Sequence, residues 1–154
     1  MNDQAQPRRP AFELEKIYVK DVSFESPAAP GIFVEKDYRP DINIDLNIEY
    51  RAMDREQGYF EVVLNIEIKA SSGERTAFLV AVQQAGVFRI ANFTDEQMPV
   101  MLEVAAPNAL LPFAREAIAD LVTRGGFPQL LIQPVNFEVL LKNRLKQQQA
   151  ESAG

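Results

Sequence analysis

The sequence predicts an α+β fold, in which a four-stranded antiparallel sheet comes first and C-terminal helices follow, packed on one face of that sheet. Three observations predict it. From residue 12 to residue 85, apolar side chains recur mainly with the period of two that is typical of strands. After Phe93 they recur with the 3.6-residue period of a helix. Turn-forming residues, including Gly58 and Gly73, lie between the predicted strands.

The first strand is predicted over residues 12–25, with a bulge in its middle. Its apolar residues alternate at both ends but lose that phase across residues 17–19, as in a bulged strand. The next segment, residues 26–40, is rich in proline, which disfavours a helix or a central strand. We therefore expect a long crossover loop, marked by Pro27, Pro30 and Pro40.

The second and third strands have the clearest pattern. Residues 41–50 read DINIDLNIEY, in which apolar residues alternate strictly with acidic or amide residues. Such alternation is typical of a strand with one buried and one solvated face. Residues 59–70 repeat the pattern, and Gly58 allows a hairpin connection between the two segments. The two strands are therefore predicted to be antiparallel neighbours.

The fourth strand, residues 76–85, is apolar on both faces. Phe78, Val80 and Val82 lie on one parity, and Ala77, Leu79 and Ala81 lie on the other. Helices of the same small domain can cover only one face of the sheet. The second apolar face is therefore expected to meet another subunit.

Two helices are predicted in the C-terminal part. Residues 110–122 carry an apolar stripe that Gly125 and Gly126 end, and Pro112 is expected at or near the first turn. Asn136 is placed as the N-cap of a second helix, whose stripe of Phe137, Leu140, Leu141 and Leu145 runs to the polar tail. Thr94 and Gln97 could form a capping box for a shorter helix before Pro107.

The composition indicates one domain. The chain has 154 residues, 47% of them hydrophobic and 25% charged. We assign the domain to residues 11–146, with a disordered N-terminal tail at 1–10 and a flexible C-terminal tail at 147–154. The sequence has neither a membrane-spanning run nor the apolar core of a signal peptide, which favours a cytosolic protein without membrane insertion.

The residue types exclude most familiar catalytic designs. With no His and no Cys, thiol nucleophiles, the common nucleophile-base pairs and most zinc sites are absent. Asp41, Asp45 and Glu49 share a strand face, which would allow a hydrolase with paired carboxylates, although a solvated strand face explains the same pattern better. We expect no enzyme activity and no cofactor or metal.

The charge pattern disfavours nucleic acid as a partner. The formal net charge is −6, and the excess of acidic residues lies in the first 114 residues, so phosphate backbones would be repelled. The basic cluster of Lys142, Arg144 and Lys146 is too short for a nucleic-acid footprint. Basic surfaces or cationic peptides are the expected partners.

Several segments resemble the SecB family of bacterial protein-export chaperones. They are IYVKDVSFESP at 17–27, TAFLVAVQQAGVFRIAN at 76–92 and PNALLPFAREAIADLVTRGGFPQLLIQPVNF at 107–137, the last being the most specific. The resemblance is colinear from residue 12 to residue 149. It implies a Greek-key-like crossover in the sheet and a homotetramer built as a dimer of dimers. It also implies binding of unfolded preproteins in apolar grooves, with delivery to the motor ATPase SecA, which docks on an acidic sheet face.

The resemblance also assigns roles to individual residues. Asp21, Glu25 and Leu79 match the family's motor-docking positions, whereas Ala81 stands where better-known members carry Glu. Val80, Val82 and Gln84 match positions tied to assembly of the oligomer, with core packing as the alternative. For clients we expect a groove to which the following aromatic residues contribute, some of which could instead be core: Phe33, Tyr38, Phe60, Phe78, Phe113 and Phe137.

One alternative within the same fold is a SecB-like holdase that acts outside export, such as a chaperone that guards an antitoxin. A chaperone of that kind would have no reason to keep a motor-docking face. Asp21, Glu25 and Leu79 therefore favour the export chaperone.

Overall fold

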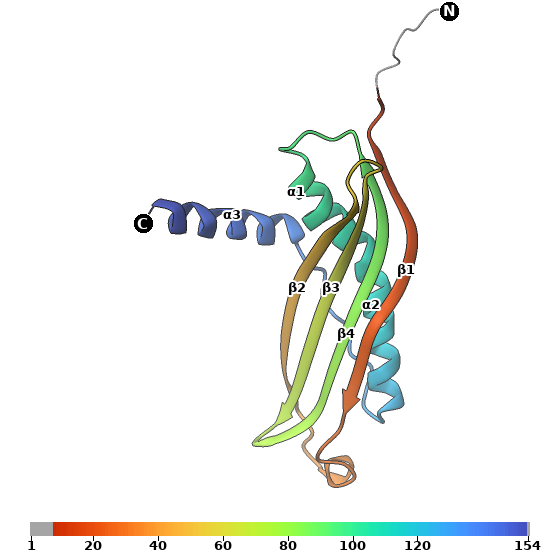
Figure 1. The fold of residues 1–154 in the computed structure, drawn as a ribbon. Helices are drawn as coiled ribbons and strands as arrows, with labels where there is room; N and C mark the ends of the chain where they lie inside the picture. The colour runs from red at the N-terminus through yellow and green to blue at the C-terminus, as the bar shows by residue number, and fades with distance from the viewer. Residues whose placement is uncertain (1–7, 154) are drawn as a thin grey trace, which may run out of the picture.

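The computed structural model describes residues 8–153, in which four long strands form one antiparallel sheet (Figure 1). The predicted N-terminal tail, residues 1–10, lies mostly outside the described residues. The strand order is β1-β4-β3-β2, so both edge strands come from the first half of the chain. The strands are β1 (Ala11–Glu25), β2 (Asp41–Asp54), β3 (Tyr59–Ser72) and β4 (Arg75–Ala91).

The crossover between β1 and β2 connects the two edges of the sheet, which confirms the predicted Greek-key-like topology. It contains a short 3-10 helix, η1 (Gly31–Val34). Arg75 at the start of β4 holds the crossover in place, because it donates hydrogen bonds to the Glu35 carboxylate at 2.7 Å and to the Ala28 carbonyl at 3.2 Å. The Ser72 hydroxyl donates to the same carboxylate at 3.1 Å. The loop is therefore fastened to the β3–β4 hairpin.

The register of β1 against β4 confirms the predicted bulge. It shifts between Leu14 and Lys16 and again between Val19 and Asp21. Beyond the second shift, Val22 and Phe24 pair with Val82 and Val80 on the helix-covered face. Because side chains alternate along a strand, Asp21, Ser23 and Glu25 must point to the opposite face.

Strand β4 runs to Ala91, six residues beyond the predicted end, and it includes Gly86. A side chain on Gly86 would come within 3.1 Å of Leu110 on the covering helix. The glycine therefore marks a close approach of helix and sheet inside the strand.

The helical part begins with the predicted capping box. The Thr94 backbone N–H donates to the Gln97 side chain at 2.9 Å, and the Gln97 N–H donates to the Thr94 hydroxyl at 3.2 Å. The helix that follows was predicted to end before Pro107. Instead, helical structure continues through three consecutive segments: α1 (Met98–Val100), the π-helical η2 (Met101–Ala105) and α2 (Ala106–Arg124).

The position predicted for Pro112 was wrong, because this proline lies inside α2. Pro112 and Asn108, the residue one turn earlier, are both exposed. Water can therefore hydrate the Asn108 carbonyl, which lacks its helical donor.

Helix α2 packs on one face of the sheet and forms the core with it, which confirms the predicted fold class. Its end at Gly125 is also as predicted. The second predicted helix is α3 (Phe137–Ala153), capped by the Asn136 side chain, which accepts from the Val139 N–H at 3.1 Å. Phe137 and Leu141 join the core, and α3 then extends away from the sheet (Figure 1). Residues 147–153, assigned above to a tail, continue α3.

Candidate functional site

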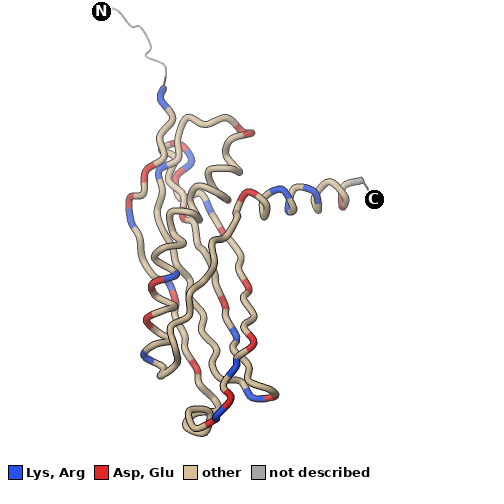
Figure 2. Tube along the Cα trace, turned by 180° about the vertical axis from the view of Figure 1, so that it is seen from behind, with Lys and Arg blue, Asp and Glu red and all other residues tan. Residues whose placement is uncertain are grey.

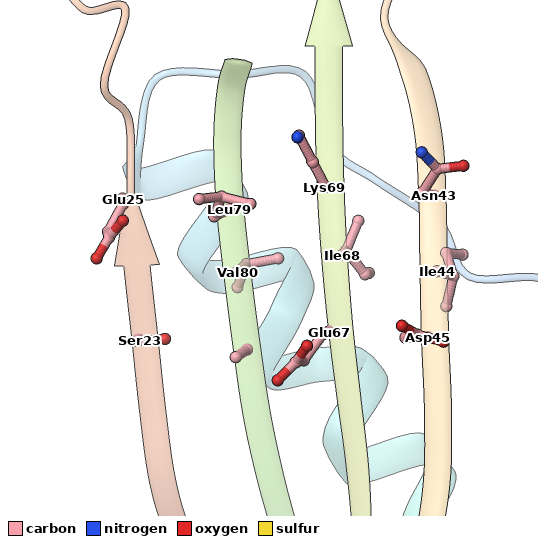
Figure 3. A pocket seen from close by; sticks show the side chains of 11 residues that line it. Ser23, Glu25, Asn43, Ile44, Asp45, Glu67, Ile68, Lys69, Leu79 and Val80 are labelled. Atoms are coloured by element: carbon pink, nitrogen blue, oxygen red, sulfur yellow. The ribbon is translucent and has the colours of Figure 1, made fainter.

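The face of the sheet opposite α2, called here the outer face, displays rows of side chains that run across all four strands. Near the crossover end, Glu25, Leu79, Lys69 and Asn43 pair in sequence across β1, β4, β3 and β2. The next row is Ser23, Ala81, Glu67 and Asp45, and the third is Asp21, Gln83, Asn65 and Asn47. Figure 3 shows side chains from the first two rows together.

This part of the outer face is hollowed into an open depression of about 710 Å³. Leu79 lies within it and is 37% exposed, so an apolar side chain stands among carboxylates. Five carboxylates lie in these three rows or in the row next to the third, and none forms an ion pair with another residue of the described range. All are exposed: Asp21, Glu25, Asp45, Glu49 and Glu67.

The structure therefore brings the three predicted docking residues to one surface. Glu25 and Leu79 are direct cross-strand neighbours, and Asp21 lies two rows away on the same face of β1. Their arrangement can offer negative charge and one apolar contact to a basic partner. Their role in binding a motor stays a prediction.

At the other end of the outer face, the acid on β3 is paired within the chain. The Glu61 carboxylate is 5% exposed and accepts hydrogen bonds from Lys20 at 3.2 Å, from Arg51 at 3.1 Å and from the Tyr18 hydroxyl. Burial raises the pKa of Glu61, but these three donors outweigh burial and hold the pKa below its ordinary value. Burial, together with the bond to Glu61, raises the pKa of Tyr18 to about 12.

The residues predicted for the oligomer interface lie in the core of the subunit. Val80, Val82 and Gln84 are 2%, 1% and 3% exposed. Gln84 donates a hydrogen bond to the Tyr18 carbonyl at 3.1 Å. Their burial within the subunit supports the alternative given above, in which these three side chains pack in the core.

The predicted client residues do not form one groove. Phe33, Tyr38 and Phe78 come together at the crossover end of the molecule, whereas Phe60 lies in the row of Phe88, near the other end of the sheet. Phe137 is 1% exposed and belongs to the core. Phe113 is 44% exposed on α2, beside Ile17 and Val19 of β1.

The residue that joins the crossover group is Phe127, which is not among the predicted client residues. Its ring centroid lies 5.2 Å from that of Phe33, 6.0 Å from Tyr38, 4.9 Å from Phe78 and 6.4 Å from Phe24. We call these five side chains the aromatic cluster. The available signal for this residue was the RGGF segment at 124–127. Its two glycines were interpreted only as a helix end.

The same two glycines give the cluster its room. A Cβ atom on Gly125 would lie 2.2 Å from the Phe24 ring, and one on Gly126 would lie 3.0 Å from Phe33. Gly126 also has a φ of +91°, which side chains rarely adopt. At the edge of the cluster, Phe33 is 48% exposed, and the next residue of the crossover, Val34, is 82% exposed.

A partly buried ion pair holds α3 to the body. Arg144 on α3 donates two hydrogen bonds to the Glu103 carboxylate of η2, one of them at 2.6 Å, and Glu103 is 8% exposed. The bond to Glu103 and the charge of that carboxylate raise the pKa of Arg144, although burial opposes them. Figure 2 shows that Lys and Arg gather along α3, where the sequence places Lys142, Arg144 and Lys146.

Residues 8–153 contain neither a membrane-spanning helix nor a cluster of metal-binding side chains. Among residues 8–153, no helix combines the length and hydrophobicity needed to cross a bilayer. Nor does this range bring three His, Cys, Asp or Glu side chains together in a way that could hold a metal ion.

Comparison with known proteins gives a consistent result. The sequence model of the SecB family, described as preprotein translocase subunit SecB, matches residues 4–148. The chain is 47% identical over 141 residues to the protein-export protein SecB of Hydrogenovibrio crunogenus, covering 92% of both chains. It is 48% identical over 143 residues to that of Dechloromonas aromatica, covering 93% of this chain and 92% of the relative.

A solved structure extends the likeness to the fold. The chain is similar, with a TM-score of 0.66, to a SecB-like chaperone of Mycobacterium tuberculosis in complex with a peptide from an antitoxin. The two are 15% identical, and the match covers 81% of this chain and 91% of that one. At this identity the likeness concerns the fold alone.

Proposed function

The chain belongs to the SecB family of protein-export chaperones, and we propose that it holds unfolded secretory precursors in the cytosol and delivers them to the motor ATPase SecA. Holding requires no chemical turnover and no cofactor. Affinity comes from many weak contacts between apolar surface and extended chain. The observation that carries the delivery step is the group of free carboxylates around exposed Leu79 on the outer face.

Exposed apolar side chains support the capture of precursors. Phe33 and Val34, adjacent residues of the crossover, are 48% and 82% exposed. Soluble proteins rarely leave such side chains in groups without a partner. Phe33 also packs against Phe127, so the aromatic cluster gives this surface a fixed base. We place the first contacts of an unfolded chain here.

The surface of β1 supports assembly into a homotetramer, as a dimer of dimers. Leu14, Val19 and Val22 are 40%, 45% and 45% exposed, although their positions in the sheet are on the helix-covered face. They lie along an edge strand, and Val19 lines the same depression as exposed Phe113 of α2. A second copy would remove this apolar edge from water.

The alternative function, guarding an antitoxin outside export, is less well supported. The relatives named as export proteins are 47% and 48% identical to this chain, whereas the chaperone solved with an antitoxin peptide is 15% identical. A hydrolase with paired carboxylates is also disfavoured, because Asp41, Asp45 and Glu49 all lie exposed on a strand face.

Native mass spectrometry tests the chaperone function. The purified chain is measured alone, with an unfolded precursor and with the same precursor after folding. We expect a particle of four chains that takes up only the unfolded form. A single chain that is indifferent to the folding state of the precursor would refute both the tetramer and the holdase.

The docking face is tested with the double variant Asp21→Lys and Glu25→Lys. We expect client capture to persist and motor binding to weaken, because both positions are exposed and lie outside the core. A matched control reverses two exposed acids elsewhere, Glu56 and Glu96, with the same change in net charge. Equal motor binding by the double variant and the unmodified chain would remove the docking assignment.

A further inference from the structure

One side chain from the β3–β4 hairpin holds both ends of the short helix in the crossover. Arg75 donates a hydrogen bond to the Ala28 carbonyl, which precedes η1, and another to the Glu35 carboxylate, which follows it. The guanidinium passes close to the backbone of η1, since a Cβ atom on Gly31 would lie 2.8 Å from Nη2 of Arg75. We call the ion pair of Arg75 and Glu35 the latch.

The segment that the latch holds covers the aromatic cluster. Ile32 is 2% exposed and belongs to the core, and the ring of the next residue, Phe33, lies 5.2 Å from that of Phe127. The Phe33 ring also rests on the backbone at Gly126, where a Cβ atom would lie 3.0 Å from it. Phe33 is half exposed, whereas Phe127 and Phe78 are buried. Phe33 is therefore the outer layer of the cluster, between Phe127 and water.

We propose that the latch keeps the crossover closed over the aromatic cluster, and that its opening admits an aromatic side chain of an unfolded client between Phe33 and Phe127. This inference rests on the proposed capture of unfolded precursors and adds a gate to that surface. A client first meets exposed Phe33 and Val34, and the opening that follows gives it a second site, which is lined by aromatic rings.

The composition of the cluster selects the class of side chain that enters. Its rings already lie 4.9 to 6.4 Å apart. Aromatic pairs with centroids about 4.5–7 Å apart gain energy beyond the burial of their surface. Burial raises the pKa of the Tyr38 hydroxyl, as expected where little water reaches the cluster. An inserted aromatic ring would therefore find both ring partners and apolar surroundings.

The structure also indicates which part of the crossover moves. Residues 33–37 lie between two side chains that pack inward, Ile32 in the core and Tyr38 against Phe127. Within the described residues, Glu35 is the only member of this segment whose side chain hydrogen-bonds to another part of the chain. Its partner Arg75 and Glu35 itself are 46% and 26% exposed, so water screens the ion pair and limits its strength. The segment can therefore open when one weak contact breaks.

A reversible cross-link tests the closed state, because the chain has no cysteine of its own. Glu35→Cys is combined with Arg75→Cys, and the two thiols are joined by a bis-methanethiosulfonate linker that a reductant removes. The probes are two fluorescent unfolded peptides that differ only in one central residue, Phe or Ala. We expect the linked chain to bind the Phe peptide no more tightly than the Ala peptide, and the reductant to restore the preference for Phe.

The variant Glu35→Ala tests the open state. Its matched control is Asp37→Ala, which removes an exposed acid from the same segment. Where the closed form predominates, the apparent affinity rises with the open fraction. Loss of one partly exposed ion pair should therefore raise the affinity for the Phe peptide about 1.5- to fivefold. The affinity for the Ala peptide and the affinities of the control should not change, and circular dichroism checks that each variant is folded.

Equal affinity of the linked and reduced chains for the Phe peptide overturns the inference. So does a Glu35→Ala chain that binds this peptide no more tightly than Asp37→Ala. If the unmodified chain captures an unfolded precursor while neither change at the latch alters binding of the Phe peptide, the gate alone fails. If the unmodified chain binds neither precursor nor peptide, the gate and the proposed holdase fail together.

Discussion

The substitution Phe127→Ala is expected to destabilise the protein and to loosen the crossover. Phe127 is 6% exposed, and four aromatic rings surround it. Truncation of a buried phenylalanine to alanine costs about 3–5 kcal/mol, most where the neighbours cannot close the cavity. Here Arg75 and Ser72 fasten the crossover to the hairpin through Glu35, which limits closure. We therefore expect a loss of about 4 kcal/mol.

Urea unfolding, followed by circular dichroism, measures this loss. Phe127→Leu keeps most of the volume and should cost less than about 1.5 kcal/mol. Phe113→Ala, at a position 44% exposed, is a control for the loss of a surface ring. Limited digestion with trypsin after Lys36 should also become faster, because the crossover loses its aromatic base. A cost below about 1 kcal/mol for Phe127→Ala would refute the role of this ring as the centre of the cluster.

Two further predictions concern buried charges. Arg144→Ala leaves the buried Glu103 carboxylate without the two hydrogen bonds that Arg144 donates to it. This loss should cost about 1.5–3 kcal/mol of stability and speed amide exchange in α3. Equal exchange in Arg144→Ala and in a Lys142→Ala control would contradict this prediction. Glu61 has a pKa below its ordinary value of 4.5, so its stabilisation is complete above that pH and is lost as the pH falls through the lowered pKa. Unfolding midpoints measured from pH 7 to pH 3 should therefore fall more steeply for the unmodified chain than for Glu61→Gln, and parallel curves would remove this role.

Much of the fold could be predicted because each element has a local signal. The alternation of residues 41–50 specifies a half-buried strand, and the reciprocal bonds of Thr94 and Gln97 follow from residue types three positions apart. The helix end at Gly125 is local in the same way. The continuous helix through Pro112 was missed because an isolated proline usually breaks a helix, and only its exposed position in the fold lets water compensate.

The candidate site was predictable only in part. Asp21 and Glu25 were placed on one face because the side chains of a strand alternate with a period of two. The grouping of the aromatic residues could not be foreseen, since Phe24, Phe78 and Phe127 are far apart in the sequence and meet only when α2 ends over the sheet. The burial of Val80 and Val82 likewise depended on which face of β4 the helix covers.

The sequence by itself determined the kinds of elements, the acidic character and the lack of thiol or imidazole chemistry, because these depend on residue types and short-range periodicity. The β2–β3 pairing was predicted from the sequence, but the tertiary structure alone decided that β4 lies between β1 and β3, and with it the pairs Glu25–Leu79 and Glu67–Ala81. Register joins residues that are distant in the chain, and the crossover that places β1 beside β4 leaves no local trace of that pairing. The surface that a partner would meet is therefore a product of the fold, although every residue in it is visible in the sequence.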